Sequence, residues 1–251
     1  RSALDWALRP RGRGAEANVA RELGSAFVLA NALRRFWAVR GHAQEGLDRY
    51  QVLLNWPGAR EDQRVRTQVA AASLAWRLGD LARAEDFAQE AVRTRRDGPE
   101  EPLAGALMSL GAIATSRGDH ARAQVCLEEA AVIVRRTGNR SALLTICINL
   151  GAALARSGAL VSARERYEEA LALAREIGDR ASEGVVLANL GSTAADLGDI
   201  ALGRELGEEG IAILRGLTNR AYLLAGLSTR TEIAQRAGDA DHAQPQAEAD
   251  V

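Results

Sequence analysis

The residues that could support chemistry in this chain are few and widely separated. Its three histidines, His42, His120 and His242, each lie at or just after a glycine that ends a helical segment. Successive segments of a helical stack lie roughly 10 Å apart, so these rings cannot converge on one metal ion. The sequence also lacks G-x-S-x-G, H-E-x-x-H and C-x-x-C motifs, which mark hydrolases, zinc proteases and redox or zinc sites. We therefore predict no catalytic activity, no metal site and no cofactor.

The charged residues point the same way. All 32 basic residues are Arg, so the chain has no Schiff-base lysine and no P-loop lysine. Glutamate pairs recur at a constant interval, at 128–129, 168–169 and 208–209. A pair repeated in this way indicates a solvated helix face rather than a catalytic dyad. Arg140, Arg180 and Arg220 recur at the same interval, and we expect them to cap helices or to form salt bridges between repeats.

The elements that position these residues follow one fixed period. Glycines close the same segment at each step, with spacings of 38, 39, 40, 40 and 40, and they are Gly41, Gly79, Gly118, Gly158, Gly198 and Gly238. A fixed period of this size is typical of stacked supersecondary units that cannot bury their apolar faces alone. The sequence predicts an all-α, right-handed solenoid of five to six antiparallel helix pairs without strands.

One repeat, residues 139–178, illustrates the pattern. Asn139 is an expected N-cap after Gly138, and apolar residues at three- and four-residue steps predict helices over about 140–157 and 160–177. Gly151 and Ala163 are predicted to lie where the two helices approach most closely. The next repeat, 181–218, carries Gly191 and Gly203 at these two positions, and its second helix also has Gly207 and Gly210. That repeat is either locally weak or closely packed on a neighbour, because glycine in a helix costs roughly 1 kcal/mol against alanine.

Composition limits the setting of the protein. Cys126 and Cys147 stand among apolar residues and are expected to be buried thiols in a reducing cytoplasm. The sequence shows no signal peptide and no apolar run long enough to span a bilayer, so we predict no membrane contact. Residues 1–66 carry 12 Arg and 7 acidic residues, whereas residues 141–251 carry 10 and 16. Without a dense Arg cluster, this gradient indicates solvated helix faces, and no direct nucleic-acid contact is expected.

Three successive repeats share small and apolar residues at equivalent positions. They are Leu110, Gly111, Gly118, Asp119, Ala123 and Ala130, then Leu150, Gly151, Gly158, Ala163 and Ala170, then Leu190, Gly191, Gly198, Asp199, Gly203 and Gly210. This pattern resembles the tetratricopeptide repeat (TPR), over about residues 65–243. Ala159 replaces the turn Asp and the usual closing Pro is absent. The period is that of the longer-helix variety of the repeat.

The N-terminal part is similar to a second family. Ser2 to Leu8, Leu33 to His42, Glu45 and Gly46 resemble the start of the C-terminal helical-repeat region of bacterial STAND-class signalling ATPases, which include LuxR- and SARP-type transcriptional regulators. In that family the repeats serve as a sensor arm. The chain begins at Arg1 and its only methionine is Met108, so we expect a piece of a longer protein. The predicted organisation is an N-terminal helix and linker (1–14), an atypical cap pair (15–62), TPR-like repeats (63–243) and a tail (244–251).

The TPR resemblance implies a concave groove lined by the first helix of each repeat. The polar or aromatic residues implied there are Trp76, Arg77, Ser109, Ser116, Asn149, Arg156, Asn189, Ser192, Asp196 and Glu232. Asparagine is unfavourable inside a helix, so Asn149 and Asn189 require a reason. They either bond an extended peptide backbone or form hydrogen bonds between repeats. Trp76 is a candidate for stacking on a ligand, whereas Trp6, Trp37 and Trp56 are expected to be buried at the cap.

The sequence thus predicts a non-catalytic domain that binds a protein or peptide segment, or other domains of its parent. Our preferred interpretation is the sensor arm of a larger bacterial signalling ATPase or transcriptional regulator. The alternative is a stand-alone TPR adaptor that scaffolds protein partners.

Overall fold

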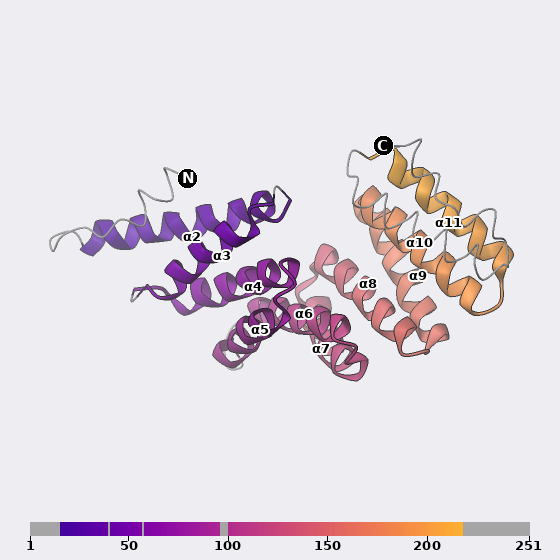
Figure 1. The fold of residues 1–251 in the computed structure, drawn as a ribbon, viewed down its shortest axis with the longest axis horizontal. Coiled ribbons are helices and arrows are strands. Elements are labelled where there is room, and N and C mark those ends of the chain that lie inside the picture. Colours follow the sequence, from indigo (N-terminus) through magenta and orange to yellow (C-terminus); the bar gives the residue numbers. More distant parts are fainter. Residues whose placement is uncertain (1–15, 40, 57, 96–99, 218–251) are drawn as a thin grey trace. The chain divides into compact units, whose positions relative to one another are not determined.

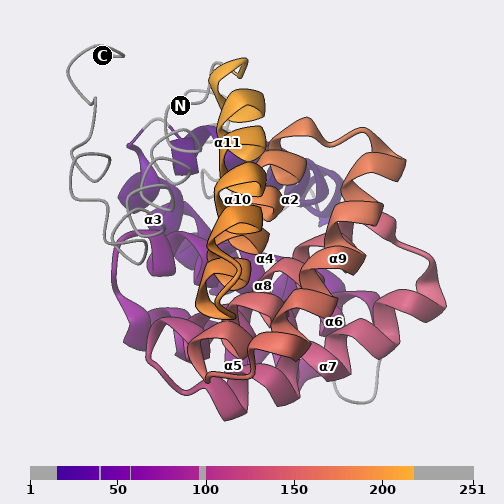
Figure 2. The same cartoon turned by 90° about the vertical axis from the view of Figure 1, so that its right-hand side faces the viewer.

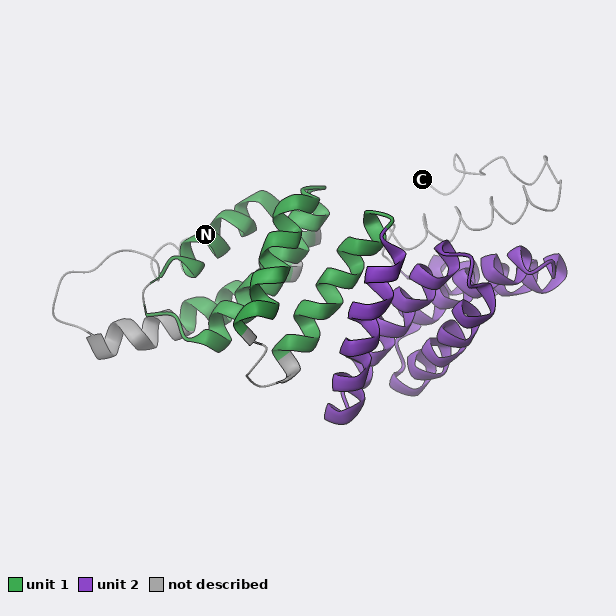
Figure 3. Cartoon of the chain, turned by 90° about the horizontal axis from the view of Figure 1, so that it is seen from below, with its two compact units in different colours: residues 1–118 green, residues 119–251 purple. Residues whose placement is uncertain are grey.

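The computed structural model describes residues 16–39, 41–56, 58–95 and 100–217. It divides the chain into two compact units, Arg1–Gly118 and Asp119–Val251 (Figure 3). The division falls inside the turn of a predicted repeat. All regular elements of the described residues are helices, and no strand occurs among them.

Unit 1 contains the first five of the described helices, which Figure 1 labels in chain order. They are α2 (Glu16–Val39), α3 (Ala43–Leu54), α4 (Glu61–Arg77), α5 (Leu81–Arg95) and α6 (Glu100–Ser116). Each helix packs on the next, and α4 also packs on α2 and α6. Because α4 has neighbours on several sides, most of its residues between Val65 and Ala75 are buried.

Unit 2 continues the alternation of helices joined by short turns (Figure 2). Its helices are α7 (His120–Thr137), α8 (Arg140–Arg156), α9 (Leu160–Ile177), α10 (Arg180–Asp196) and α11 (Ile200–Arg215). The most extensive packing in this unit joins α10 to α11 and α8 to α9. The predicted fold class, an α-solenoid of stacked antiparallel helix pairs, is confirmed. The helices predicted within residues 139–178 agree closely with α8 and α9.

The ends of these helices follow the predicted capping rules. Asn139 and Asp179 each accept a hydrogen bond from the backbone N–H three residues on, which satisfies a donor that the first helical turn leaves unpaired. Gly138 and Gly178 precede them with φ of 73°, a left-handed conformation that suits glycine. At the start of α9 the expected cap residue is replaced by Ala159, and no side chain caps that helix.

The α8–α9 pair is held by a large buried side chain. Tyr167 on α9 is 3% exposed, and its ring lies directly against Gly151 on α8. A Cβ at Gly151 would be 2.6 Å from Cε1 of Tyr167. Gly151 therefore makes room for an aromatic ring of the facing helix, a partner that the sequence analysis did not name. Ala163 is fully buried.

The α10–α11 pair is held by backbone contact. A Cβ at Gly191 would lie 2.7 Å from the carbonyl oxygen of Gly203 and 2.9 Å from the nitrogen of Gly207. Near the other end of the pair, a Cβ at Gly210 would lie 2.7 Å from the carbonyl oxygen of Gly184. Of the two alternatives stated for this repeat, the structure shows close packing.

Candidate functional site

The predicted groove residues of unit 2 form a strip on two helices. Asn149 and Arg156 lie on α8, two helical turns apart, and Asn189, Ser192 and Asp196 lie on α10 at steps of three and four. These spacings place the residues of each helix on one face. We refer to these five residues as the polar strip of unit 2. Because α8 and α10 are equivalent helices of successive repeats, Asn149 corresponds to Asn189, and Arg156 corresponds to Asp196.

The two asparagines of the polar strip are half-buried. Neither side chain hydrogen-bonds to another residue within the described part of unit 2. The backbone carbonyl of Asn189, not its side chain, accepts a hydrogen bond from the Thr193 hydroxyl, at 2.8 Å. The predicted alternative, a hydrogen bond of these side chains between repeats, is therefore not formed among the described residues. Both amides keep a donor and an acceptor available.

Charges mark the C-terminal end of the strip. Arg156 and Asp196 occupy the last helical position of α8 and α10, and both side chains are exposed. The Arg156 guanidinium also acts on the buried phenol of Tyr167. Burial raises the pKa of Tyr167 above its ordinary range, and the nearby positive charge of Arg156 opposes that rise. The strip therefore has half-buried amides along its length and opposite charges on its two helices.

In unit 1 the predicted groove residues are bonded to the protein itself. The indole N–H of Trp76 on α4 donates to the hydroxyl of Ser116 on α6, at 2.8 Å. Ser116 in turn donates to the Ala112 carbonyl, at 3.1 Å. Trp76 is 41% exposed, so the ring still offers an open face while its polar atom joins two successive first helices.

Arg77 and Ser109 also have internal partners. Nε of Arg77 donates to the Ala38 carbonyl at the end of α2, at 3.2 Å. The Ser109 hydroxyl donates to the Gly105 carbonyl of its own helix, at 3.0 Å. Glu232, the last predicted groove residue, lies outside the described residues. The sequence therefore predicted a shared helix face, but it did not show that the unit 1 members use their polar atoms on neighbouring backbone and side chains.

Two of the three histidines lie among the described residues, one in each unit. His42 stacks on Phe36, with ring centroids 5.5 Å apart. His120 begins α7, and His242 lies outside the described residues. No group of three or more His, Cys, Asp or Glu side chains among the described residues is arranged to hold a metal ion.

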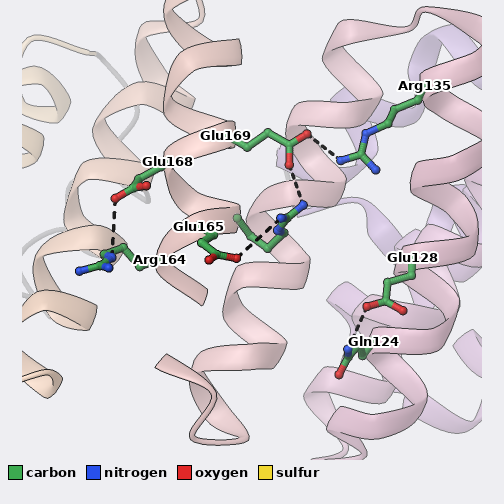
Figure 4. A network of polar contacts seen from close by, with 8 residues as sticks. Gln124, Glu128, Arg135, Arg164, Glu165, Glu168 and Glu169 are labelled. Atoms are coloured by element: carbon green, nitrogen blue, oxygen red, sulfur yellow. Dashed lines mark hydrogen bonds and ion pairs between the residues drawn. The ribbon is translucent and has the colours of Figure 1, made fainter. Parts of the chain in front are cut away.

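The repeated glutamates form contacts between and within helices (Figure 4). Glu169 accepts hydrogen bonds from Arg135 of α7, at 2.7 Å, and from Arg166, at 2.9 Å. Its neighbour Glu168 pairs with Arg164, at 3.7 Å. Donation of this hydrogen bond to Glu169 raises the pKa of Arg135 above its ordinary value. Glu168 is exposed, as expected of a solvated helix face, whereas Glu169 is half-buried and bonded to two arginines.

A second ion pair occupies the equivalent place in the next repeat. Arg175 on α9 reaches Glu209 on α11, at 3.4 Å, as Arg135 on α7 reaches Glu169 on α9. Arg175 also contacts Glu183 on α10, at 3.0 Å, and Glu183 is 5% exposed. The repeated glutamates were recognised from the sequence but their partners were missed, although Arg135 and Arg175 recur at the same interval.

We expected the arginines after the caps to cap helices or to form salt bridges between repeats, but the salt bridges that Arg140 and Arg180 form lie within their own repeats. Arg140 pairs with Glu176 at the end of α9, at 3.2 Å, and Arg180 contacts Glu183 within the first turn of α10. Arg220 lies outside the described residues.

The two cysteines are buried and unpaired, as expected. Burial raises the pKa of Cys126, and it raises the pKa of Cys147 to about 12, with a further contribution from Glu169. Such thiols are poor nucleophiles at neutral pH.

Comparison with known proteins supports a TPR domain. Residues 102–176 match the family model of the tetratricopeptide repeat. No curated protein matches the chain. None of the described helices is long and apolar enough to cross a bilayer.

Solved structures share the fold at low sequence identity. BtubC from P. vanneervenii is 22% identical, with a TM-score of 0.63 over 81% of this chain and 84% of that one. A kinesin-light-chain protein of P. anserina with nearly identical TPR-like repeats is 19% identical, with a TM-score of 0.62 over 76% and 96%. A Rap protein complexed with Competence and Sporulation Factor is 14% identical, with a TM-score of 0.72 over 95% and 65%. These likenesses establish the fold alone.

Proposed function

We propose that this chain is a non-catalytic binding module that holds a protein or peptide segment along the polar strip of unit 2. The premise is the TPR family match over residues 102–176, since TPR domains fit a protein–protein interaction role. The observation that carries the proposal is the pair of half-buried amides, Asn149 and Asn189, without a hydrogen bond to another described residue. Half-buried amides in helix interiors are unfavourable unless they acquire partners.

The chemistry of the strip suits an extended peptide. An amide side chain can donate to a backbone carbonyl and accept from a backbone N–H at the same time. Arg156 can form a bidentate contact with a carboxylate side chain or a chain terminus. Asp196, on the other helix, would oppose the same group. A segment with an acidic group near α8 and a basic group near α10 would therefore bind in one direction.

Two settings for this module are part of the proposal. In the first, it is the sensor arm of a larger bacterial signalling ATPase or transcriptional regulator. Capture of a ligand would then act on the parent only if the ligand binds its resting and active forms with different affinity. In the second, it is an adaptor that scaffolds protein partners, and the structural likeness to the Rap protein complexed with Competence and Sporulation Factor fits this setting. Buried, unpaired Cys126 and Cys147 favour a reducing compartment such as the cytoplasm.

The experiment is a double substitution, Asn149→Ala with Asn189→Ala. A partner is first recovered by affinity capture, its binding segment is purified, and the dissociation constant is measured by calorimetry. We expect the double variant to bind at least about tenfold more weakly, since two hydrogen-bonding groups are lost. Gln124→Ala is the matched control, because it removes an amide that bonds to Glu128 on its own helix.

Unaltered affinity in the double variant, with an unchanged circular dichroism spectrum, would remove the polar strip from the proposal. A loss of affinity in Gln124→Ala of equal size would show that the effect is a general one of amide removal.

A further inference from the structure

Unit 2 contains a buried tyrosine whose hydroxyl group has no partner. Tyr167 on α9 is 3% exposed, and its phenol forms no hydrogen bond with another described residue. The other buried tyrosine of the described residues, Tyr50 on α3, donates its hydroxyl to the Ala30 carbonyl at 3.1 Å. A buried hydroxyl without a partner is unfavourable, and phenylalanine would fill the same space without that cost. Packing against Gly151 therefore explains the ring of Tyr167 but not its hydroxyl.

The phenol oxygen of Tyr167 can be reached from the surface. Within the part of the chain that the structure describes, the side-chain atoms that are both fully enclosed and unpaired belong to Thr67, Gln68 and His120. The phenol oxygen of Tyr167 is not one of them, so it keeps some contact with solvent. A group that arrives from outside can take up its hydrogen bond.

The direction of the ring places this oxygen toward the end of α8. Long side chains on a helix lean toward its N-terminus, and α9 begins at Leu160, four residues after Arg156. The two helices pack against each other and are joined by a short turn (Figure 1). Arg156 is also the residue whose positive charge acts on the phenol. The hydroxyl and the guanidinium therefore belong to the same end of the polar strip.

This end of α8 presents hydrogen-bond donors. The turn that follows the helix already donates to the carbonyls of Ala153, Leu154 and Ala155. Arg156 is exposed and forms no ion pair or hydrogen bond with another described residue. Within residues 150–156 the only other side chains that are not buried are those of Ala152 and Ala155, so no long side chain of α8 covers the ring.

We infer that the Tyr167 phenol is a second donor of the proposed site, which acts with Arg156 to bind a carboxylate of the peptide held along the polar strip. Burial keeps the phenol protonated at neutral pH, because it raises its pKa. One carboxylate can accept from the guanidinium and from the phenol at the same time. This inference rests on the proposed function and names the group that is recognised at the C-terminal end of α8. The carboxylate belongs to an Asp or Glu side chain or to a chain terminus, which share this chemistry.

The test uses three short peptides with the whole chain. The first is acetyl-Ala-Glu-Ala-amide, the second has Gln in place of Glu, and the third is acetyl-Ala-Ala-Ala with a free C-terminus. Backbone amide shifts at the C-terminal end of α8 are followed by NMR at constant ionic strength, up to about 50 mM peptide. We expect the carboxylate peptides to bind with dissociation constants of about 1–20 mM, as for a single small contact, and the Gln peptide at least fivefold more weakly. The tighter of the two carboxylate peptides identifies the source of the carboxylate.

Substitutions then assign the binding to the two donors. Arg156→Gln should weaken the carboxylate peptides about tenfold or more, and Tyr167→Phe about fivefold, without a change for the Gln peptide. A purely structural role of the hydroxyl would not change the ratio between the Glu and Gln peptides. Tyr50→Phe is the matched control for the phenol, since its hydroxyl is bonded within unit 1. Arg164→Gln is the control for the guanidinium, since Arg164 pairs with Glu168 on its own helix.

Several results would overturn the inference. It fails if the carboxylate peptides do not bind, if the Gln peptide binds as tightly as the Glu peptide, or if Tyr167→Phe or Arg156→Gln leaves the carboxylate affinity unchanged. The proposed function is tested separately by Asn149→Ala with Asn189→Ala. A partner segment weakened by that double variant, with carboxylate peptides indifferent to Tyr167→Phe, would retain the polar strip and remove the phenol. The reverse result would retain the carboxylate contact and remove the two amides.

Discussion

The α8–α9 and α10–α11 pairs solve the same packing problem in opposite ways. Gly151 and Gly191 hold the same position in successive repeats. Across from Gly151 stands the buried ring of Tyr167, whereas across from Gly191 stands Gly207, the residue that corresponds to Tyr167 in the next repeat. In α8–α9 a side chain fills the space between the helices, whereas in α10–α11 the two backbones are in direct contact.

The difference shows that a small residue at a repeat position does not fix the distance between helices. The residue on the facing helix determines whether the space beside the glycine holds an aromatic ring or whether the two backbones come into contact. In α10–α11 the glycines Gly184, Gly191, Gly203 and Gly210 all lie close to backbone or buried side chains of the facing helix. Their helix-propensity cost of roughly 1 kcal/mol each is offset by dispersion contacts between closely approaching backbones.

Removing the ring should have the largest effect. Tyr167→Ala leaves a void against Gly151, and the loss of a large aromatic from a core typically costs about 3–5 kcal/mol. Urea denaturation followed by circular dichroism measures the loss. Tyr167→Phe keeps the ring and should cost less than about 1.5 kcal/mol. Similar midpoints for Tyr167→Ala and Tyr167→Phe would mean that the ring does not hold the pair together.

Replacing each of the two glycines with alanine should destabilise the two helix pairs to different extents. Gly191→Ala places a Cβ against backbone atoms, which cannot move independently, and we expect a loss of about 2–3 kcal/mol. Gly151→Ala places a Cβ against the Tyr167 ring, which can rotate, and we expect about 1 kcal/mol. Gly151→Leu should exceed Gly151→Ala, because no rotation of the ring accommodates it. An equal loss in the two alanine variants, measured by thermal unfolding, would contradict the comparison.

Alkaline pH should destabilise the α8–α9 pair, which contains the buried Cys147, more than the α10–α11 pair. Burial raises the pKa of Cys147 to about 12, whereas an unfolded thiol ionises near pH 8.5, to within about one unit. Between these two pKa values the unfolded state binds fewer protons than the folded state. The free energy of unfolding therefore falls by up to ~1.4 kcal/mol for each unit by which the pH rises, and below about pH 8.5 the ionisation of Cys147 causes no loss.

The corresponding position in α10 is Leu187, which does not ionise. Cys147→Ala should therefore reduce the decline in stability between about pH 8.5 and pH 10, as measured by urea midpoints. Cys126→Ala provides a comparison on α7. The interpretation fails if Cys147→Ala and the unaltered chain lose stability in parallel.

The ion pairs should give the smallest effects. Arg175 contacts carboxylates on α10 and α11, so Arg175→Met should cost about 1 kcal/mol, whereas Arg135→Met should cost about 0.5 kcal/mol. Both losses should shrink in 1 M salt, where exposed charges are screened over about 3 Å. Equal losses at low salt would show that the contact of Arg175 with the buried Glu183 adds nothing.

Local rules in the sequence were sufficient to predict the fold. The turn glycines, the caps at Asn139 and Asp179 and the three- and four-residue apolar steps each act within a few residues, so a single repeat contains the information that defines it. The reason for Gly151 was not accessible in this way, because Tyr167 lies on the following helix. A residue pattern alone does not show which side chain fills a gap.

The candidate site was predictable only as a set of positions. Helix periodicity placed Asn149 and Asn189 on equivalent faces of α8 and α10. It could not show that Trp76 donates its indole N–H to Ser116, because that bond depends on rotamers and on the distance between successive helices. The sequence also did not predict that Val28 and Phe36 on α2 are exposed, because apolar residues on two sides of a helix do not show which side packs.

The repeated caps and ion pairs imply that the number of repeats in this protein can change without loss of the local contacts. Deleting residues 139–178 would join Gly138 directly to Asp179. A left-handed glycine would again precede an N-cap side chain, as Gly138 now precedes Asn139. Arg135 would then stand 34 positions before Glu209, the separation that now joins Arg135 to Glu169. A gene encoding such a protein can therefore lose or duplicate one whole repeat by unequal recombination and still specify compatible turns, caps and cross-links at the junction.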